Sequence, residues 1–536
     1  EKSTSRGRRF LPLIMRFHLI LSLVGIIIAF FGMSFIIPII TGLLLGEKIS
    51  DISFMFILPM LLCILGGGFL YYYFHTEEDI RNREAFVLVP TVWIFMVIVG
   101  AFPYIVSERL GLMSYEMGVF GAIFESMSGL STTGATMLEV PENKEIINQK
   151  QYTEGYFDAP KSLLLWRSET QWLGGMGIIV LATIIFSRLF GGGVQVLQAE
   201  MPGTGITRLK PQMAQTARLL WSLYFALTFL EVVLLFALTE MPLYDSICNS
   251  FSTVSTGGFS PKIESIGSYD DPVSDLIITL FMFVSGINFV ILYYVFNYLI
   301  RRTDSFSKNL KSAFKVIRDN DEFKVYCFLI FICFFAIFLN RTLLGENLEY
   351  GTNFRYTLFQ TVSLLTGTGF TTTDYTIWPN LSIFILFSTM FMGGCAGSTT
   401  GGIKMVRIML LFKALKREMF LVIHPRAIIK LRIGGKVLDE DLFRNVGVFF
   451  FIFMILFVGG SFIVLYLEPS LDLIDGVSVS LSCLANIGPG LGAIGPSTTY
   501  YGFSDATLLF LSALMMLGRL EIITVLLLFF PDTYRD

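Results

Sequence analysis

Four short polar loops, each carrying glycine, interrupt long apolar runs of this sequence. They read STTGAT at residues 131–136, STVSTGGFS at 252–260, TGTGFT at 366–371 and NIGPG at 486–490. When the loops are aligned on Gly134, Gly257, Gly369 and Gly488, successive glycines lie 123, 112 and 119 residues apart. This near-constant spacing indicates an internal fourfold repeat. Because glycine has no side chain, such loops can bring backbone carbonyl oxygens close to a common axis.

The loops offer neutral oxygen atoms, and no carboxylate stands immediately beside an aligned glycine. Carbonyls gathered around an axis can replace the water that surrounds an ion, and the preceding Thr133, Thr256 and Thr368 could add hydroxyl oxygens. Neutral ligands favour a large monovalent cation over a tightly held divalent one, which would need Asp or Glu. The alternative is ordinary packing of small residues between membrane helices. The predicted coordinating residues are Thr132, Thr133, Gly134, Ala135, Ser255, Thr256, Gly257, Gly258, Gly367, Thr368, Gly369, Phe370, Asn486, Ile487, Gly488 and Pro489.

A second glycine-rich stretch, GGCAGSTTGGIK at residues 393–404, lies inside a long apolar run. So many glycines will not hold a continuous α-helix, and non-helical backbone at membrane depth must be buried in protein or line a cavity. We interpret the stretch as a flexible obstruction in a permeation path, and close helix packing is the alternative. Its residues are Gly393, Gly394, Cys395, Ala396, Gly397, Ser398, Thr399, Thr400, Gly401, Gly402 and Lys404.

Arg519 lies within the last apolar run, with Glu521 close by in the sequence. An arginine inside a membrane span is costly and usually faces a cavity or a partner. It could bind the carbonyls of residues 393–404 or form a positive barrier beneath the loops. A purely structural pair with Glu521 or with another helix is the alternative.

Composition places these loops in a membrane. The chain of 536 residues is 54% hydrophobic and 15% charged, with a mean hydropathy of +0.68, whereas soluble proteins carry about 25% charged residues. Its apolar runs are long enough to cross a bilayer as helices. The six cysteines and three histidines are scattered without metal-ligand spacing. We therefore expect no enzyme, no covalent cofactor and no nucleic-acid partner.

The apolar runs predict an all-α polytopic membrane protein, with two leading transmembrane helices and four helix–re-entrant pore loop–helix repeats around a central pore. A half-length segment that ends in a polar loop cannot span, so it must re-enter. The leading helices are predicted at 17–45 and 52–74. The repeats are predicted at 86–106, 117–130 and 162–186; 217–239, 244–254 and 273–300; 325–344, 354–365 and 381–412; and 446–467, 473–485 and 506–529. The corresponding domains are 1–84, 85–190, 191–302, 303–413 and 414–536.

Charge predicts the orientation. With both termini in the cytoplasm, the inside segments hold 29 of the 39 Lys and Arg residues, as the positive-inside rule requires. The loops then enter from outside, where Glu139, Glu264, Asp374 and Asp505 flank them. These residues could form a negative vestibule that concentrates cations, or they could be ordinary solvated charges.

The motifs resemble those of the TrkH/TrkG/KtrB superfamily of potassium-uptake proteins. The matching stretches are WLGGMGIIVLA at 172–182, STGGFS at 255–260, GFTTTDY at 369–375, residues 393–404, NIGPGLG at 486–492 and LGRLEI at 517–522. The two leading helices look more like the TrkH branch. Thr400 departs from the expected pattern, which has glycine there in many relatives.

The resemblance implies that the coordinating residues form a potassium selectivity filter, with K⁺ held by backbone carbonyls as the transported ion. It implies that residues 393–404 are a gating loop with Arg519 as its partner. It also implies a homodimer in the bacterial inner membrane that binds a cytoplasmic TrkA-like nucleotide-binding subunit. The longest predicted cytoplasmic loop, 413–445, is too short for a nucleotide-binding domain of roughly 100 residues.

Two other classes of function remain possible from the residues. A secondary transporter coupled to Na⁺ or H⁺ would often use inverted repeats, but the four predicted repeats share one orientation. Glu125 and Glu231 are the main candidates for a buried proton relay. A membrane enzyme would need a catalytic constellation that the sequence does not offer.

Overall fold

The chain folds almost entirely into helices. The computed structural model describes residues 16–76, 82–139, 149–189, 213–300, 306–344, 349–427, 432–433, 436–437, 440–520 and 522–531. In these ranges the one sheet is a small antiparallel hairpin of β1 (Arg432–Ile433) and β2 (Lys436–Val437). Six of the described helices are long and apolar enough to cross a membrane, and one bent helix pair is a seventh candidate. The protein is therefore a polytopic helical membrane protein, as predicted.

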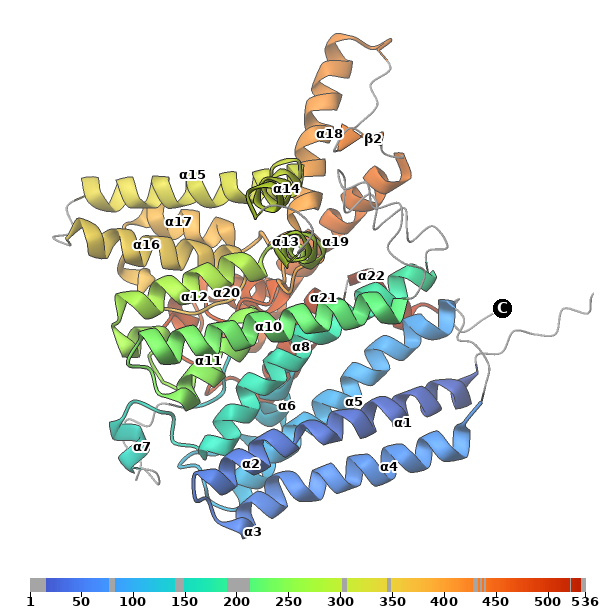
Figure 1. The fold of residues 1–536 in the computed structure, drawn as a ribbon, viewed down its shortest axis with the longest axis vertical. Coiled ribbons are helices and arrows are strands. Elements are labelled where there is room, and N and C mark those ends of the chain that lie inside the picture. Colours follow the sequence, from blue (N-terminus) through green and yellow to red (C-terminus); the bar gives the residue numbers. More distant parts are fainter. Residues whose placement is uncertain are drawn as a thin grey trace, which may run out of the picture.

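The two leading spans form an antiparallel pair along one edge of the molecule (Figure 1). The first contains α1 (Phe17–Ser34) and α2 (Ile36–Leu44). The second contains α3 (Ile49–Ile52), a π-helical turn and α4 (Leu58–Phe74). α1 packs against α4, and Gly25 and Gly67 meet at this contact, where a Cβ on either would collide with the carbonyl oxygen of the other. Glycine lets the two backbones approach closely.

Four units follow, each with an outer helix, a half-length helix and an inner helix. The first has α5 (Asn82–Arg109), α6 (Gly118–Leu130) and α8 (Lys161–Leu189). The second has α10 (Met213–Leu238), α11 (Leu243–Val254), α12 (Pro272–Ser285) and α13 (Phe289–Ile300). The third has α15 (Asp321–Leu343), α16 (Tyr350–Leu365), α17 (Asn380–Thr389) and α18 (Met405–Ile423). The fourth has α19 (Glu440–Leu467), α20 (Leu473–Ala485), α21 (Asp505–Arg519) and α22 (Ile522–Leu526).

The units close into a ring. The inner helix of one unit packs against the half-length helix of the next at three junctions: α8 on α11, α12 on α16, and α21 on α6. The remaining junction, between the third and fourth units, differs because the inner helix of the third unit is interrupted. There Gly401 lies against the end of α20, where an added Cβ would collide with the carbonyl oxygen of Ala485. The four half-length helices therefore lie around one centre. Two further helices, α7 (Gln149–Thr153) and α14 (Phe306–Arg318), lie in connections between elements.

Two predicted continuous spans, 273–300 and 506–529, were wrong because the structure breaks both. α12 and α13 are bent by 106° at residues 286–288, and there the Gly286 carbonyl accepts a hydrogen bond from Cys395 N–H at 2.8 Å instead of continuing the helix. The last span divides where α21 ends at Arg519 and α22 begins at Ile522. The run 381–412 is also broken, between α17 and α18, and the glycine-rich stretch occupies the gap, as its composition predicted.

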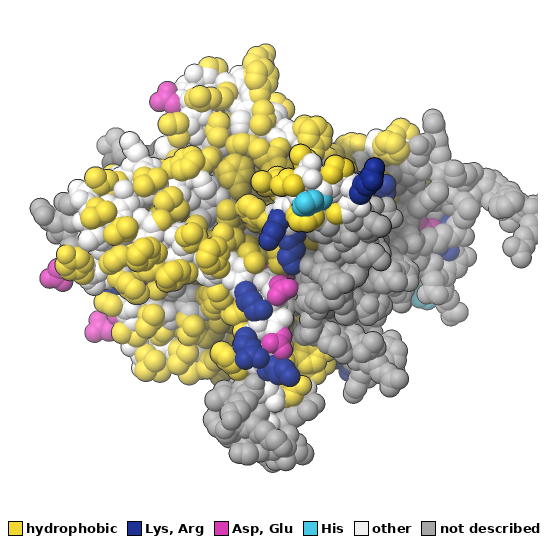
Figure 2. Space-filling model, turned by 90° about the horizontal axis from the view of Figure 1, so that it is seen from above, with side chains coloured by type: hydrophobic (Ala, Val, Ile, Leu, Met, Phe, Trp, Pro, Cys, Tyr) yellow, Lys and Arg dark blue, Asp and Glu magenta, His cyan; other side chains and the backbone are white. Residues whose placement is uncertain are grey.

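The surface agrees with a membrane location. Hydrophobic side chains cover most of the described surface seen in Figure 2, and Lys and Arg gather in a band near the middle of this view. On α15, Phe328, Phe331 and Phe335 are each more than half exposed. Such an apolar surface is stable against lipid rather than water. α18 extends beyond the helical bundle (Figure 1), and Lys413, Lys416 and Arg417 lie at and just after its midpoint.

Candidate ion pathway

The four half-length helices end in the same way. In each, one backbone N–H of the following loop donates to the carbonyl oxygen of a serine five residues earlier. These bonds are Thr133 to Ser128 at 2.9 Å, Gly257 to Ser252 at 2.8 Å, Thr368 to Ser363 at 2.9 Å and Ile487 to Ser482 at 3.0 Å. The repeated bond directs each loop away from its helix at an equivalent place. The C-terminal end of a helix carries partial negative charge, which favours a nearby cation.

Backbone angles define the equivalent loop positions. A left-handed residue stands at Thr132, Thr256, Gly367 and Asn486, with φ of 52°, 54°, 67° and 55°. Two residues later each loop has a left-handed glycine: Gly134, Gly258, Gly369 and Gly488, with φ of 84°, 81°, 80° and 96°. The equivalent glycine in the second loop is therefore Gly258, and the predicted alignment on Gly257 was wrong by one residue. Sequence cannot choose between two adjacent glycines, whereas the backbone conformation does.

These four glycines interlock, and we call them the glycine ring. A Cβ on Gly134 would collide with the carbonyl oxygen of Gly257, on Gly258 with that of Thr368, and on Gly369 with that of Ile487. A Cβ on Gly488 would lie 2.5 Å from the carbonyl oxygen of Thr133, which closes the cycle. Each carbonyl thus belongs to one loop and lies against the glycine of a neighbouring loop. Both the left-handed backbone and the lack of space require glycine at these positions.

Buried side chains support the first two loops from behind. Gln171 of α8 donates from Nε2 to the Gly257 carbonyl at 2.6 Å and accepts at Oε1 from Phe259 N–H at 3.0 Å. Arg167 pairs with Glu125 at 2.7 Å and donates to the Ser260 carbonyl at 3.1 Å. The sequence reasoning missed Arg167 and Gln171 as supports, although the five consecutive polar residues RSETQ at 167–171, inside a predicted span, were a signal.

The proposed proton-relay residues differ in their surroundings. The Glu125 carboxylate is held by Arg167 and also accepts from Met137 N–H at 2.7 Å. Glu125 therefore serves as a structural ion-pair partner beside the first loop. Glu231 is fully buried on α10, and it does not line the pocket at the glycine ring.

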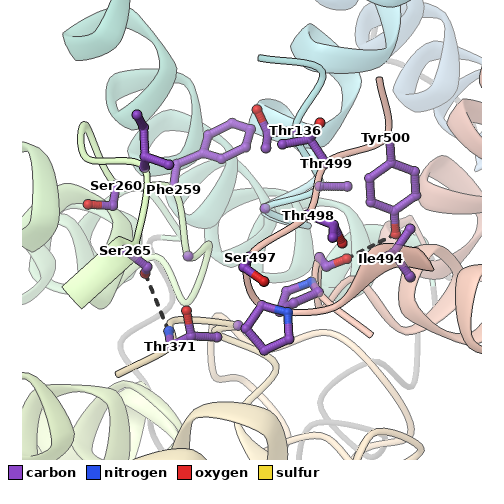
Figure 3. Close-up of a pocket in the computed structure, with 18 of the residues that line it drawn as sticks. Thr136, Phe259, Ser260, Ser265, Thr371, Ile494, Ser497, Thr498, Thr499 and Tyr500 are labelled. Carbon is purple, nitrogen blue, oxygen red and sulfur yellow. Dashed lines mark hydrogen bonds between the residues drawn. The ribbon is translucent and has the colours of Figure 1, made fainter. Parts of the chain in front are cut away.

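A pocket lies against the glycine ring and is lined by all four of its glycines. Figure 3 shows hydroxyl groups from several loops around it, including those of Thr136, Ser260 and Thr371. Residues 494–500 of the fourth unit form one wall of the pocket. Tyr500 holds this wall in place with two hydrogen bonds: its N–H donates to the Thr136 carbonyl at 2.8 Å, and its hydroxyl donates to the Gly488 carbonyl at 2.9 Å.

The charge of this pocket differs from the sequence expectation. Its charged lining residues are Arg167 and Lys262, and none of the acidic residues predicted to form a negative vestibule lines it. Asp374, for example, caps a short turn by accepting from Thr376 N–H at 2.8 Å. The lining therefore includes two cationic side chains and no carboxylate, and its other residues are neutral, several of them with hydroxyl groups. Among the described residues, no group of three His, Cys, Asp or Glu could hold a metal ion.

The glycine-rich stretch 393–404 lies directly against the end of α11. The Thr399 hydroxyl donates to the Val254 carbonyl at 3.2 Å and accepts from the Thr256 hydroxyl at 3.3 Å. The stretch also pairs with the bend between α12 and α13, because Phe289 N–H donates to the Gly397 carbonyl at 3.2 Å. Its non-helical backbone is buried in protein, as such backbone must be in a membrane.

Arg519 connects this stretch to two other units. Its side chain is 5% exposed, and Nη1 donates to the Thr399 carbonyl at 2.6 Å while Nη2 lies 3.5 Å from the Gly174 carbonyl. The predicted alternative partner, Glu521, lies outside the described residues. At the other end of the stretch, Lys404 donates to the Thr400 hydroxyl at 3.1 Å. The stretch is thus fixed to its surroundings by backbone hydrogen bonds to the α12–α13 bend and by single side chains such as Arg519.

Comparison with known proteins gives consistent matches over nearly the whole chain. The family described as TrkH, cation transport protein, matches residues 52–534. The Trk system potassium uptake protein TrkH of Salmonella typhimurium is 32% identical over 528 residues, covering 97% of this chain and 100% of the relative. The Trk system potassium uptake protein TrkG of Escherichia coli is 31% identical over 513 residues, covering 96% and 97%. The crystal structure of the potassium transporter TrkH from Vibrio parahaemolyticus is similar with a TM-score of 0.81 and 30% identity, covering 97% of this chain and 100% of that chain.

Proposed function

Because the chain belongs to the TrkH family of cation transport proteins, we propose that it conducts potassium ions into the cell through the glycine ring. The cyclic contact of the four loops carries this proposal. An ion at the ring would exchange its water for backbone carbonyl oxygens, and neutral dipoles suit a large monovalent cation. The residues predicted above to coordinate the ion are therefore proposed as a potassium selectivity filter.

We assign the gate to residues 393–404 together with Arg519. This stretch is buried against the end of α11, and its Thr399 hydroxyl accepts a hydrogen bond from the left-handed Thr256 of the second loop. An ion that leaves the ring toward this side would meet the stretch. Its contacts with Arg519, Thr256 and the α12–α13 bend are few and local, so a modest rearrangement would release it.

The assembly around the pore is part of the proposal. The protein is proposed to lie in the bacterial inner membrane as a homodimer with both termini in the cytoplasm, and its five domains to follow the predicted boundaries. A TrkA-like nucleotide-binding subunit would dock on the side that carries α14 and α18. The distribution of Lys and Arg supports this orientation, since 29 of 39 fall on the proposed inside segments.

Ion flux through the purified protein in liposomes tests the proposed function. With opposing K⁺ and Na⁺ gradients and no partner subunit, flux that follows the K⁺ gradient alone supports a selective pore. Flux that requires Na⁺ on the same side as K⁺ would instead support a cation-coupled secondary transporter. Deletion of residues 396–401 is expected to raise flux in the absence of the partner, and an unchanged rate would contradict the gate assignment.

A further inference from the structure

The stretch 393–404 has a second charged neighbour, opposite in sign to Arg519. Glu322, in the first turn of α15, is fully buried. One of its carboxylate oxygens, Oε1, accepts from Ala396 N–H at 2.6 Å and from Val406 N–H at 3.1 Å. A single oxygen therefore joins the middle of the stretch to the first turn of α18.

Physical chemistry favours a carboxylate at this place. The backbone of residues 393–404 leaves the helical pattern, so its buried N–H groups need acceptors from elsewhere. A charged acceptor forms shorter and stronger hydrogen bonds than a neutral one. Val406 also lies at the N-terminal end of α18, where the helix carries partial positive charge that stabilises a carboxylate. The negative charge of Glu322 therefore suits both N–H groups that it accepts from, those of Ala396 and Val406.

Glu322 and Arg519 hold the stretch from two different units. Glu322 of the third unit accepts from the N–H of Ala396, and Arg519 of the fourth unit donates to the carbonyl of Thr399. The bound atoms lie only three residues apart in the chain. Movement of either α15 or α21 would therefore withdraw a charged partner from this part of the backbone.

We propose that Glu322 is a positioning residue that holds the gate closed, and this proposal rests on the gating role assigned above to residues 393–404. Glu322 does not touch the ion path itself; it acts through the backbone of Ala396 and Val406. Its place in the chain adds a route for control. α14 ends at Arg318 and α15 begins at Asp321, with Asn320 capping α15 through a 2.8 Å bond from Phe323 N–H. A force on α14 from the cytoplasmic side reaches Glu322 across this short connection.

The substitution Glu322→Gln tests the proposal in the full-length protein reconstituted in liposomes. The amide keeps the size and one acceptor oxygen but removes the charge, so partner-independent K⁺ flux is expected to rise about tenfold, the scale of the difference between a charged and a neutral hydrogen bond. Asp321→Asn is the matched control, because Asp321 is the adjacent carboxylate and makes longer ion pairs with Lys324 at 3.4 Å and Lys413 at 3.9 Å. Flux in the control is expected to stay within about twofold of the unmodified protein.

Two readouts separate gate release from general damage. Cys395 lies in the stretch and is fully buried, so in a background without the other five cysteines its labelling by a membrane-impermeant thiol reagent reports opening. Labelling from the cytoplasmic side should accelerate in Glu322→Gln and not in Asp321→Asn. Discrimination between K⁺ and Na⁺ should remain unchanged, because the glycine ring is intact. Loss of discrimination would show a structural defect and overturn the positioning role.

The deletion of residues 396–401 separates this proposal from the assigned gate. Raised flux in the deletion variant with unchanged flux and labelling in Glu322→Gln would overturn the role of Glu322 and leave the gate assignment standing. Unchanged flux in both would overturn the gate itself. Glu322→Asp is the second variant, since it keeps the charge but shortens the side chain by one methylene. Its flux should lie between those of the unmodified protein and Glu322→Gln. Flux equal to that of the unmodified protein would contradict the idea that the carboxylate must reach the N–H groups of Ala396 and Val406.

Discussion

The glycine ring and residues 393–404 are both glycine-rich, non-helical and buried, yet they are held in different ways. The ring is built from four copies of one backbone arrangement, in which each glycine lies against a carbonyl of a neighbouring loop. The stretch 393–404 occurs once. Two backbone hydrogen bonds and close glycine contacts hold it to its neighbours, and individual side chains, among them Glu322, Arg519 and Thr256, add further bonds. Repeated backbone contacts make a site that is hard to displace. The bonds from single side chains can be lost when the helices that carry those side chains move.

The largest effect is expected where the ring itself is broken. In Gly258→Ser, the new Cβ would meet the Thr368 carbonyl while φ stays near 81°. A left-handed backbone and an overpacked contact each cost roughly 1–3 kcal/mol, so K⁺ flux should fall about a hundredfold, with loss of K⁺ over Na⁺ discrimination. Flux and discrimination in liposomes measure both effects.

The control for this variant is Gly459→Ala on α19, where an added Cβ meets nothing within 4 Å. It should behave like the unmodified protein. Gly257→Ser is the informative companion, because its Cβ would meet the Gln171 side chain rather than backbone. A flexible side chain can shift, so discrimination should weaken less than in Gly258→Ser. The reverse order would contradict the structural alignment of the second loop.

Release of the stretch should change flux in the opposite direction. Arg519→Gln removes the charged donor to the Thr399 carbonyl, and the loss of one charged hydrogen bond predicts about a tenfold rise in partner-independent K⁺ flux. K⁺ over Na⁺ discrimination should be retained. Arg318→Gln is the control, since that arginine side chain is 66% exposed. A fall in flux in Arg519→Gln would indicate that this arginine supports the pore instead of closing it.

The smallest effect is expected from a support behind the ring. Gln171→Leu removes two hydrogen bonds to the second loop, at Gly257 and Phe259. The other three loops and the interlocked glycines remain, so K⁺ over Na⁺ discrimination should fall about fivefold, which is less than the full loss of two neutral hydrogen bonds would give. Bi-ionic flux measurements test this. Gln360→Leu on α16 is the control, because that buried amide has no hydrogen-bond partner among the described residues. Equal effects in both variants would remove Gln171 as a specific support.

Much of the architecture was predictable because it depends on the length of local apolar runs and on the placement of glycine. Apolar runs near 20 residues predicted the leading pair, and half-length runs ending in glycine loops predicted the re-entrant helices α6, α11, α16 and α20. The glycine content of residues 393–404 predicted the break between α17 and α18. These features depend on composition and spacing, which the chain carries wherever it folds.

Other features were decided by contacts between distant parts of the chain. Nothing local distinguishes Gly257 from Gly258; the difference arises because Gly258 meets the Thr368 carbonyl of the next loop. The bend at residues 286–288 occurs where Gly286 pairs with Cys395, and periodicity alone predicted an uninterrupted helix there. Glu322 lies outside the predicted span 325–344, and only the folded structure places its carboxylate beside Ala396 N–H.

The sequence by itself determined that this is a membrane protein with four related glycine loops, because hydropathy and glycine placement are properties of each segment. Only the tertiary structure decided which glycines interlock, which helices bend, and which buried charges hold residues 393–404. The physical reason is that buried backbone groups must find partners. Where the local helix does not supply a hydrogen-bond partner, the partner comes from another unit that packs against the segment in the folded protein.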